Sequence, residues 1–222
     1  MRGIIACVKK AILFDLDGTL LDTEESILSA FIHAFTTHKA THPARDNILR
    51  LMGRPIRDMY KMLAPEYDTE RMLDAHREFQ GQNLDLVKSF SGVPETLAKL
   101  RSAGLKLAIV TSRLRPSCIA YLEATNLRNV FATIVTGDDV KNQKPDPESV
   151  FRALTALDVL PPDAFMVGDT FADIGAGKNA GVATIGALYG HQGEGIRDLK
   201  PDYLIGSFEE ILSIVSSTTP PP

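Results

Sequence analysis

The chain has 222 residues, of which 44% are hydrophobic and 23% are charged, and its formal net charge is -4. These values are typical of a globular protein with one substantial domain, or one domain that carries a smaller insertion. A mildly acidic chain without long basic runs is a poor candidate for binding nucleic acid or an anionic membrane. The only two cysteines, Cys7 and Cys118, have no metal-binding spacing, which predicts reduced thiols in a cytoplasmic protein.

Neither end of the chain is expected to contribute to the core. No hydrophobic stretch approaches the roughly 18 residues that span a bilayer, and "GIIACV" near the start is too short for a signal-peptide core. We expect residues 1–7 to be a dispensable segment before the first strand. The closing "SSTTPPP", residues 216–222, has the composition of a tail that cannot pack into a core.

The first predicted strand, residues 11–14, runs directly into two acidic residues in "AILFDLDGTLLD". Asp15 and Asp17 are separated by one leucine and are followed at once by Gly18 and Thr19. Like charges this close repel, and burying even one of them is costly without compensation. The pair is therefore either solvated at a strand end or bound to a cation.

Residues 22–88 contain no convincing strand and instead show helical periodicity. We expect an inserted helical subdomain directly after the first strand. Three apolar faces at helical spacing support it, the third only loosely: Ile27, Leu28, Phe31, Ala34 and Phe35; Ile56, Met59, Tyr60 and Leu63; Met72, Leu73, Phe79, Leu84 and Val87.

The remainder of the chain alternates short apolar runs with helical patterns. With residues 11–14 the runs make six candidate strands: 105–110, 131–135, 164–167, 182–185 and 203–205 complete the set. Each run is nearly continuous, as expected for parallel strands that are covered on both faces. The alternation predicts an α/β fold with a doubly wound, Rossmann-like parallel sheet. We assign residues 1–21 and 89–222 to this core and residues 22–88 to the helical cap.

Polar side chains follow four of the predicted strands, at the edge where ligands bind in open parallel sheets. Asp15 and Asp17 follow the first strand, and the second is followed by Thr111, Ser112 and Arg113. Lys144 lies in "KPDP" after the third, and Asp169 and Asp173 follow the fourth. Carboxylates, hydroxyls and one lysine are therefore predicted to meet at one edge of the sheet.

This set of residues has the chemistry that phosphoryl transfer requires. Asp15, Asp17 and Asp169 could share Mg²⁺, which prefers a few carboxylates together with waters and a substrate phosphate. Thr111 and Lys144 could donate hydrogen bonds to the other phosphoryl oxygens, where charge spreads in the transition state. One carboxylate can attack phosphorus while another transfers protons.

The four segments "DLDGTL", "VTS", "KPDP" and "GDTFAD" resemble, in this order, the four motifs of the haloacid dehalogenase-type phosphohydrolase superfamily. The resemblance covers nearly the whole chain, and the helical insertion is similar to the small cap of that family. It implies that Asp15 is the nucleophile and Asp17 the general acid and base. It also implies that Mg²⁺ is bound by Asp15, the backbone carbonyl of Asp17 and Asp169.

The same resemblance assigns roles to three further positions. Thr111 and Lys144, with Ser112 beside them, would bind the transferring phosphoryl group. Asp173 would support the metal site and orient Lys144. An acid-base role near neutral pH requires a raised pKa, and we expect the nearby Asp15 and an apolar cap to raise the pKa of Asp17.

The segment "GDTFADIGAGKNAG" most resembles phosphoglycolate phosphatases and the related pyrophosphatases. The implied activity is Mg²⁺-dependent hydrolysis of a small phosphate monoester, phosphoglycolate-like, through an aspartyl phosphate. An inorganic pyrophosphatase and a sugar-phosphate mutase of the same family are the alternatives. The implied partner is a small phosphorylated metabolite. The sequence carries no signal for an oligomeric state.

In the cap, "GRPIRDMY" is the segment expected to select the substrate. Arg54 and Arg57 could face an anionic leaving group, although solvated arginines at a helix start are equally compatible with the pattern. "GAGKNA", residues 175–180, has the spacing of a dinucleotide-binding loop. We expect it to lie well inside a helix, where its glycines permit close packing.

A receiver-type signalling module is the strongest alternative from another class. It also combines an aspartyl phosphate, Mg²⁺, a hydroxyl and a lysine on a parallel sheet. A module that retains its phosphate has no need of a proton-transferring carboxylate at the position of Asp17. The receiver fold also has no place for residues 22–88.

Overall fold

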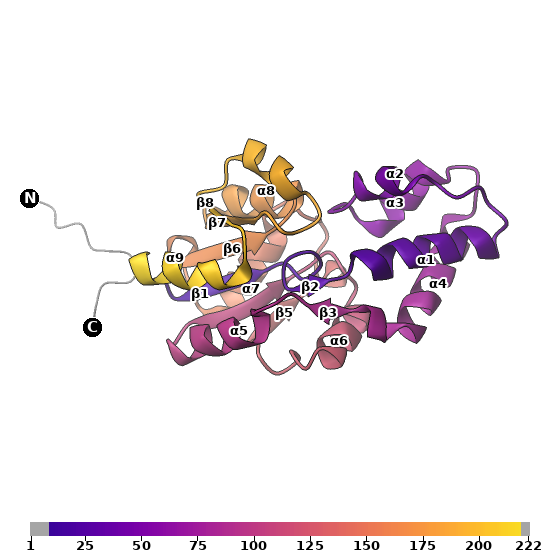
Figure 1. The fold of residues 1–222 in the computed structure, drawn as a ribbon. Helices are drawn as coiled ribbons and strands as arrows, with labels where there is room; N and C mark the ends of the chain where they lie inside the picture. Colours follow the sequence, from indigo (N-terminus) through magenta and orange to yellow (C-terminus); the bar gives the residue numbers. More distant parts are fainter. Residues whose placement is uncertain (1–8, 219–222) are drawn as a thin grey trace, which may run out of the picture.

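The computed structural model describes residues 9–218, so the expectations for residues 1–7 and for positions 219–222 lie outside it. Six parallel strands form one sheet in the order β5-β4-β1-β6-β7-β8. Figure 1 shows this core at one end of the molecule and helices α1 to α4 at the other. The strands are β1 (Ala11–Phe14), β4 (Lys106–Val110), β5 (Thr133–Val135), β6 (Ala164–Gly168), β7 (Ala183–Ala187) and β8 (Tyr203–Ile205).

Five helices cover the sheet, with 3-10 turns between several elements. The helices are α5 (Val93–Ser102), α6 (Arg115–Ala124), α7 (Glu148–Leu157), α8 (Phe171–Ala180) and α9 (Ile211–Thr218). Helices α5, α6 and α9 pack on one face, and α7 and α8 pack on the other. The predicted doubly wound sheet is confirmed, and each predicted strand overlaps an observed one.

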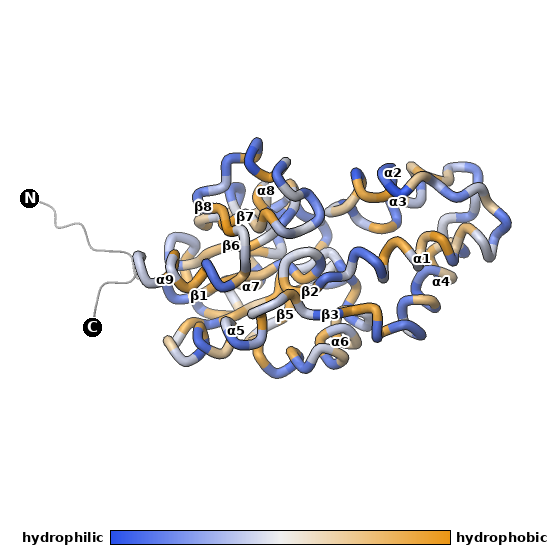
Figure 2. The backbone as a smooth tube through the Cα atoms, in the orientation of Figure 1, coloured by the Kyte–Doolittle hydropathy of each residue, from blue (hydrophilic) through white to orange (hydrophobic). Residues whose placement is uncertain are grey.

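Strand β1 shows why the apolar runs are continuous. Ile12 and Phe14 belong to the hydrophobic cluster on one face, whereas Ala11 and Leu13 belong to the cluster on the other. Successive side chains of a strand point to opposite faces, so a strand covered on both sides must be apolar at every position. All four of these residues are fully buried. The hydropathy colouring of Figure 2 shows the same apolar character along the central strands.

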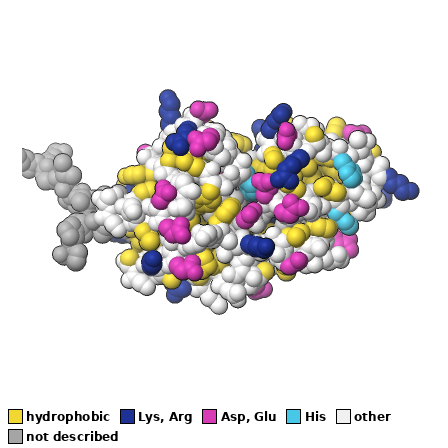
Figure 3. Space-filling model, viewed as in Figure 1, with side chains coloured by type: hydrophobic (Ala, Val, Ile, Leu, Met, Phe, Trp, Pro, Cys, Tyr) yellow, Lys and Arg dark blue, Asp and Glu magenta, His cyan; other side chains and the backbone are white. Residues whose placement is uncertain are grey.

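The cap consists of α1 (Glu24–Thr37), α2 (Arg45–Leu49), α3 (Ile56–Leu63) and α4 (Thr69–Gln82). It has a hydrophobic cluster of its own, in which the ring of Phe31 lies 4.6 Å from that of Tyr60. The two predicted faces on α1 and α3 contribute to this cluster. Figure 3 shows the cap and the core as two lobes, with basic and acidic side chains interspersed on this face.

A short pair of strands at the base of the cap was not expected from the sequence. Two-residue strands, β2 (Leu21–Asp22) and β3 (Lys88–Ser89), pair antiparallel where the chain enters and leaves the cap. They are too short to produce a periodic pattern. The pairing holds the two connections side by side. Within residues 9–218, no helix combines the length and the apolarity needed to cross a membrane.

The backbone pairing of β1 continues past its last residue and fixes the start of the site. The amide of Asp15 donates to the carbonyl of Val167 at 2.9 Å, and the amide of Thr111 donates to the carbonyl of Val135 at 3.0 Å. The residues that follow neighbouring strands are thereby held at one edge of the sheet, as expected for parallel strands.

The segment "GAGKNA" lies inside α8, as the sequence predicted. Gly177 lies against the sheet, and a Cβ atom at this position would lie 2.6 Å from Cγ2 of Thr184 and 3.1 Å from Cβ of Met166. Thr184 cannot rotate away without loss, because its hydroxyl donates to Asp202 at 2.8 Å. Close packing of helix on strand therefore accounts for this glycine.

We predict that Gly177→Ala lowers the free energy of unfolding by about 1–2 kcal/mol, because overpacking costs more than the gain in helix propensity. Gly81→Ala is the matched control, since Gly81 lies in α4 with no atom near the added methyl group. It should raise the free energy of unfolding by about 0.5–1 kcal/mol. Urea denaturation of both variants provides the measurement, and stabilisation by Gly177→Ala would contradict the packing explanation.

Candidate active site

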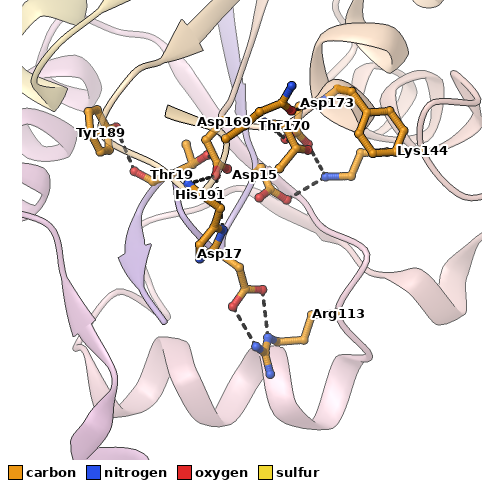
Figure 4. Close-up of polar contacts among 12 residues, drawn as sticks. Asp15, Asp17, Thr19, Arg113, Lys144, Asp169, Thr170, Asp173, Tyr189 and His191 are labelled. Carbon is orange, nitrogen blue, oxygen red and sulfur yellow. Dashed lines mark hydrogen bonds and ion pairs between the residues drawn. The ribbon is translucent and has the colours of Figure 1, made fainter. Parts of the chain in front are cut away.

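A buried lysine connects two carboxylates at the carboxyl edge of the sheet. The ammonium of Lys144 donates to Asp15 at 2.7 Å, to Asp173 at 2.6 Å and to the carbonyl of Val110 at 3.0 Å (Figure 4). All three ammonium protons are therefore used. The Lys144 side chain is only 4% exposed, so these partners replace its hydration.

Helix α8 begins with a capping box that holds Asp173 in place. The amide and the hydroxyl of Thr170 both donate to Oδ2 of Asp173, at 3.0 and 2.6 Å. This arrangement leaves Oδ1 of Asp173 for Lys144. The "GDTFAD" segment thus starts a helix and positions a carboxylate with the same residues.

The pKa of Asp15 is raised well above its ordinary value. Burial contributes most, the charge of Asp173 adds to it, and Lys144 opposes the shift only in part. Burial lowers the pKa of Lys144, but the two carboxylates outweigh it and hold that pKa above its usual value. The cluster therefore carries more negative charge than one lysine offsets.

Asp169 is fully buried and is held by three groups. The hydroxyl of Thr19 donates to its Oδ1 at 2.9 Å, and the amide of His191 donates to its Oδ2 at 2.7 Å. The imidazole Nδ1 of His191 lies 3.3 Å from the same oxygen. Burial lowers the pKa of His191, but the Asp169 carboxylate more than offsets this effect and raises it to about 9.

Gly18 permits this close approach of the loop after β1. Its φ angle is +79°, and a Cβ atom there would lie 2.3 Å from Oδ2 of Asp169 and 2.4 Å from Nδ1 of His191. Any side chain would therefore displace the carboxylate. The glycine of "DLDGTL" is required both by its backbone conformation and by its neighbours.

The buried carboxylates fit a hard divalent cation. Asp15, Asp169 and Asp173 each present an oxygen within 4.8 Å of the other two, and all three residues are buried. An all-oxygen donor set with excess negative charge is the coordination chemistry that Mg²⁺ prefers. The Asp17 carboxylate is not part of this group of three, which leaves only its backbone carbonyl for the role implied by the family resemblance.

The carboxylate of Asp17 is bound by Arg113. The guanidinium donates to both oxygens, from Nε at 3.0 Å and from Nη2 at 2.7 Å, and it stacks on the ring of Tyr121 at 4.0 Å. Figure 4 shows Asp17 pointing away from the Lys144 cluster toward Arg113. Burial raises the pKa of Asp17, but the charge and hydrogen bonds of Arg113 outweigh it and leave the pKa below its ordinary value. The expectation of a raised pKa was wrong, because it took no account of a bidentate arginine.

The other predicted residues line a cleft of about 650 Å³ between the cap and the core. Thr111 and Ser112 lie at the end of β4, and the hydroxyl of Thr111 accepts from the amide of Arg113 at 3.1 Å. The cap contributes Arg54 and Arg57 to the same cleft. The structure thus brings every predicted site residue except Asp169 into the cleft lining, and Asp169 lies directly behind it.

The two cap arginines differ in their surroundings. Arg54 reaches the core, where its guanidinium lies 5.6 Å from the ring centroid of Phe171. Arg57 forms an ion pair with Glu70, and both side chains are about half exposed. The charge of Arg57 is therefore partly neutralised and screened by solvent, whereas Arg54 bridges the cap and the core.

Sequence analysis missed the roles of Arg113 and His191. Arg113 was noted only as a residue that follows a strand, since nothing local shows that it pairs with Asp17 across 96 positions. His191 follows β7, and the residues after that strand were not considered. Its signal is the same as for the other site residues, since His191 lies shortly after a predicted strand, residues 182–185.

Comparison with known proteins covers most of the chain. The haloacid dehalogenase-like hydrolase family matches residues 12–187. The chain is 40% identical to pyrophosphatase PpaX of Halalkalibacterium halodurans over 206 residues, which cover 92% of this chain and 95% of that protein. It is 36% identical to pyrophosphatase PpaX of Anoxybacillus flavithermus over 210 residues, with coverage of 94% and 97%.

Among solved structures, a predicted phosphoglycolate phosphatase from Haemophilus somnus has a TM-score of 0.86. Its sequence identity is 24%, and the match covers 96% of this chain and 99% of that one. At this identity the likeness supports the fold alone. The family match and the sequence identity to the two pyrophosphatases show the family directly. The chain belongs to the haloacid dehalogenase-like hydrolase family.

Proposed function

We propose that this protein hydrolyses inorganic pyrophosphate through a phosphorylated Asp15, with Mg²⁺ bound at the carboxylate cluster. The observation that carries the proposal is the buried group of Asp15, Asp173 and Lys144 at the base of a cleft that the cap covers. The two relatives named pyrophosphatase favour pyrophosphate over the phosphoglycolate-like monoester expected from sequence.

Asp15, Asp169 and the backbone carbonyl of Asp17 would hold the cation, which when bound neutralises charge on the substrate phosphate. The first step forms a bond between a carboxylate oxygen of Asp15 and phosphorus and breaks the bond from phosphorus to the bridging oxygen. Lys144 and Thr111 stabilise the charge that spreads over the phosphoryl oxygens. The other phosphate departs with the electron pair of the broken bond.

The second step returns Asp15 to its free form. Water attacks phosphorus, Asp17 takes up the proton, and the bond between phosphorus and Asp15 breaks. Because Arg113 holds the pKa of Asp17 low, this carboxylate is ionised at neutral pH and ready to accept a proton. A low pKa disfavours the opposite task, which is to protonate a strongly basic alkoxide. A departing phosphate can carry its own proton, so Asp17 suits pyrophosphate better than an alkyl monoester.

In this reaction the cap would cover the cleft and contact the leaving group. We assign residues 22–88 to a domain that covers the cleft and residues 1–21 and 89–222 to the catalytic core. Arg54, which already contacts Phe171 of the core, would face the anionic leaving group, and Arg57 would contribute less because Glu70 neutralises it. Closure of such a lid excludes water from the transferring phosphoryl group.

Metal removal tests the carboxylate cluster. We expect exhaustive chelation to abolish pyrophosphate hydrolysis and Mg²⁺ to restore it. Ca²⁺ should restore little, because it prefers more ligands at longer distances and so misplaces the nucleophile. Phosphate release with each ion provides the measurement, and full activity after chelation would refute the assignment of the metal.

Substitution of Asp15 and substitution of Asp17 are predicted to affect different steps of the reaction. Asp15→Asn should leave no turnover, because the nucleophile is lost. Asp17→Asn should lower the turnover of pyrophosphate by roughly 10²- to 10⁴-fold, the usual contribution of a positioned acid or base. Its first step should persist, so phosphorylated protein should accumulate and be visible as a mass increase that hydroxylamine removes.

Asp22→Asn is the matched control for both variants. Asp22 belongs to the same segment but is exposed in β2, outside the cleft. Its removal should leave turnover unchanged. A phosphoryl adduct on any residue other than Asp15 would refute the proposed roles.

The substrate is tested by comparing pyrophosphate with phosphoglycolate and a hexose phosphate at one Mg²⁺ concentration. We expect kcat/KM to be highest for pyrophosphate by about tenfold or more, which corresponds to about 1.4 kcal/mol of transition-state stabilisation. A preference for phosphoglycolate would reinstate the monoester expected from sequence. A preference for the hexose phosphate would favour sugar-phosphate chemistry.

A further inference from the structure

Helix α4 presents two buried polar side chains to the cleft, at positions that the catalytic steps do not use. His76 and Gln80 are one helical turn apart, both line the cleft, and they are 1% and 5% exposed. Residues four apart share one face of a helix. Within residues 9–218, Nε2 of His76 and Nε2 of Gln80 are buried and make no hydrogen bond.

The orientation of the Gln80 amide is fixed by Arg113. The guanidinium Nη1 donates to Oε1 of Gln80 at 3.1 Å. A guanidinium has no acceptor, so the amide oxygen must face it and the amide nitrogen must face away. The side-chain oxygen of Gln80 is therefore turned toward Arg113, and its two N–H groups are left as donors.

The tautomer of His76 is fixed in a similar way by Tyr60. The Tyr60 hydroxyl lies 2.9 Å from Nδ1 of His76 and has no other hydrogen bond among the described residues. Burial raises the pKa of Tyr60 and keeps it protonated, so its only satisfied arrangement donates to Nδ1. Burial, with the charges of Arg113 and Arg77, lowers the pKa of His76 to about 3, so the ring is neutral. Its remaining proton is on Nε2, which is a second donor.

The acceptors of both side chains are thus used within the protein, and their donors are left unpaired in the wall of the cleft. A buried donor without a partner is destabilising, which implies that an acceptor from outside the protein completes the pair. A wall with donors only suits a group that accepts hydrogen bonds and donates none. A sugar hydroxyl is a poorer fit, because its own proton would find no acceptor on either residue.

We propose that His76 and Gln80 form the leaving-group subsite of the cleft and select substrates whose leaving group is an oxyanion, a phosphate or a carboxylate. This inference rests on the proposed function, which places the transferring phosphoryl group at Asp15. Tyr60 is a positioning residue that fixes the tautomer of His76, and Arg113 fixes the amide of Gln80. The subsite thereby disfavours polyol phosphates, the substrates of a sugar-phosphate mutase.

The test replaces the donor and keeps the contact with Arg113. Gln80→Glu retains an acceptor for the guanidinium but presents a second carboxylate oxygen to the cleft. We expect the ratio of kcat/KM for pyrophosphate to kcat/KM for an aryl phosphate to fall by about 10- to 100-fold, the range for a charged hydrogen bond. Gln80→Met, which removes the donor without adding charge, should lower the ratio by about tenfold.

Gln82→Glu is the matched control. Gln82 lies on the same helix, is exposed and bonds only to Glu78 among the described residues, so the variant adds the same charge outside the cleft. Its substrate ratio should equal that of the wild type. Nitrogen-15 NMR of the histidines adds a second measurement, in which a proton on Nδ1 of His76 would overturn the inference.

The outcomes separate this inference from the proposed function. If the wild type hydrolyses pyrophosphate and Gln80→Glu loses activity equally on both substrates, the subsite is wrong and the function stands. If the wild type hydrolyses no phosphate compound, the function is wrong, and calorimetry with methylenediphosphonate decides the subsite. Binding at least about tenfold weaker in Gln80→Glu than in Gln82→Glu supports it, and equal binding overturns it.

Discussion

The repulsion among three buried carboxylates, two of which are paired with one lysine, is the constraint on which the site depends. Asp15 lies more than 150 residues before Asp169 and Asp173, and the three would not gather without compensation. The sheet order supplies the geometry, because β1 lies between β4 and β6. Lys144 comes from a third segment of the chain and offsets part of the negative charge of Asp15 and Asp173. The remaining negative charge is what the proposed Mg²⁺ would neutralise.

Arg113 links Asp17 of the core to the cap. Its guanidinium contacts Asp17 of the core, Gln80 of the cap and the ring of Tyr121 at the same time. One side chain therefore keeps the pKa of Asp17 low and fixes the orientation of a cap amide. Helix α4 of the cap and Asp17 of the core therefore contact the same guanidinium.

Local patterns predicted the fold because they reflect burial on both faces of a strand. The run Ala11–Phe14 matches β1 residue for residue, and Tyr203–Ile205 matches β8. The order of the strands and the antiparallel pairing of β2 with β3 depend on contacts between distant segments, which periodicity does not encode. For the same reason Gln80, in the polar stretch "REFQGQ", reads as a surface residue. Only the contact of α4 with the core buries it.

Two features of the cleft, both of which involve Arg113, favour the same leaving group in the proposed reaction. Arg113 keeps Asp17 ionised, which suits a departing group that needs no proton from the enzyme. His76 and Gln80 present donors alone, which suits a departing group that only accepts hydrogen bonds. A phosphate meets both conditions, a carboxylate-bearing alkoxide meets only the second, and a sugar hydroxyl meets neither. In the proposed reaction, pyrophosphate is therefore the substrate whose need for protons and whose hydrogen bonding both match the cleft.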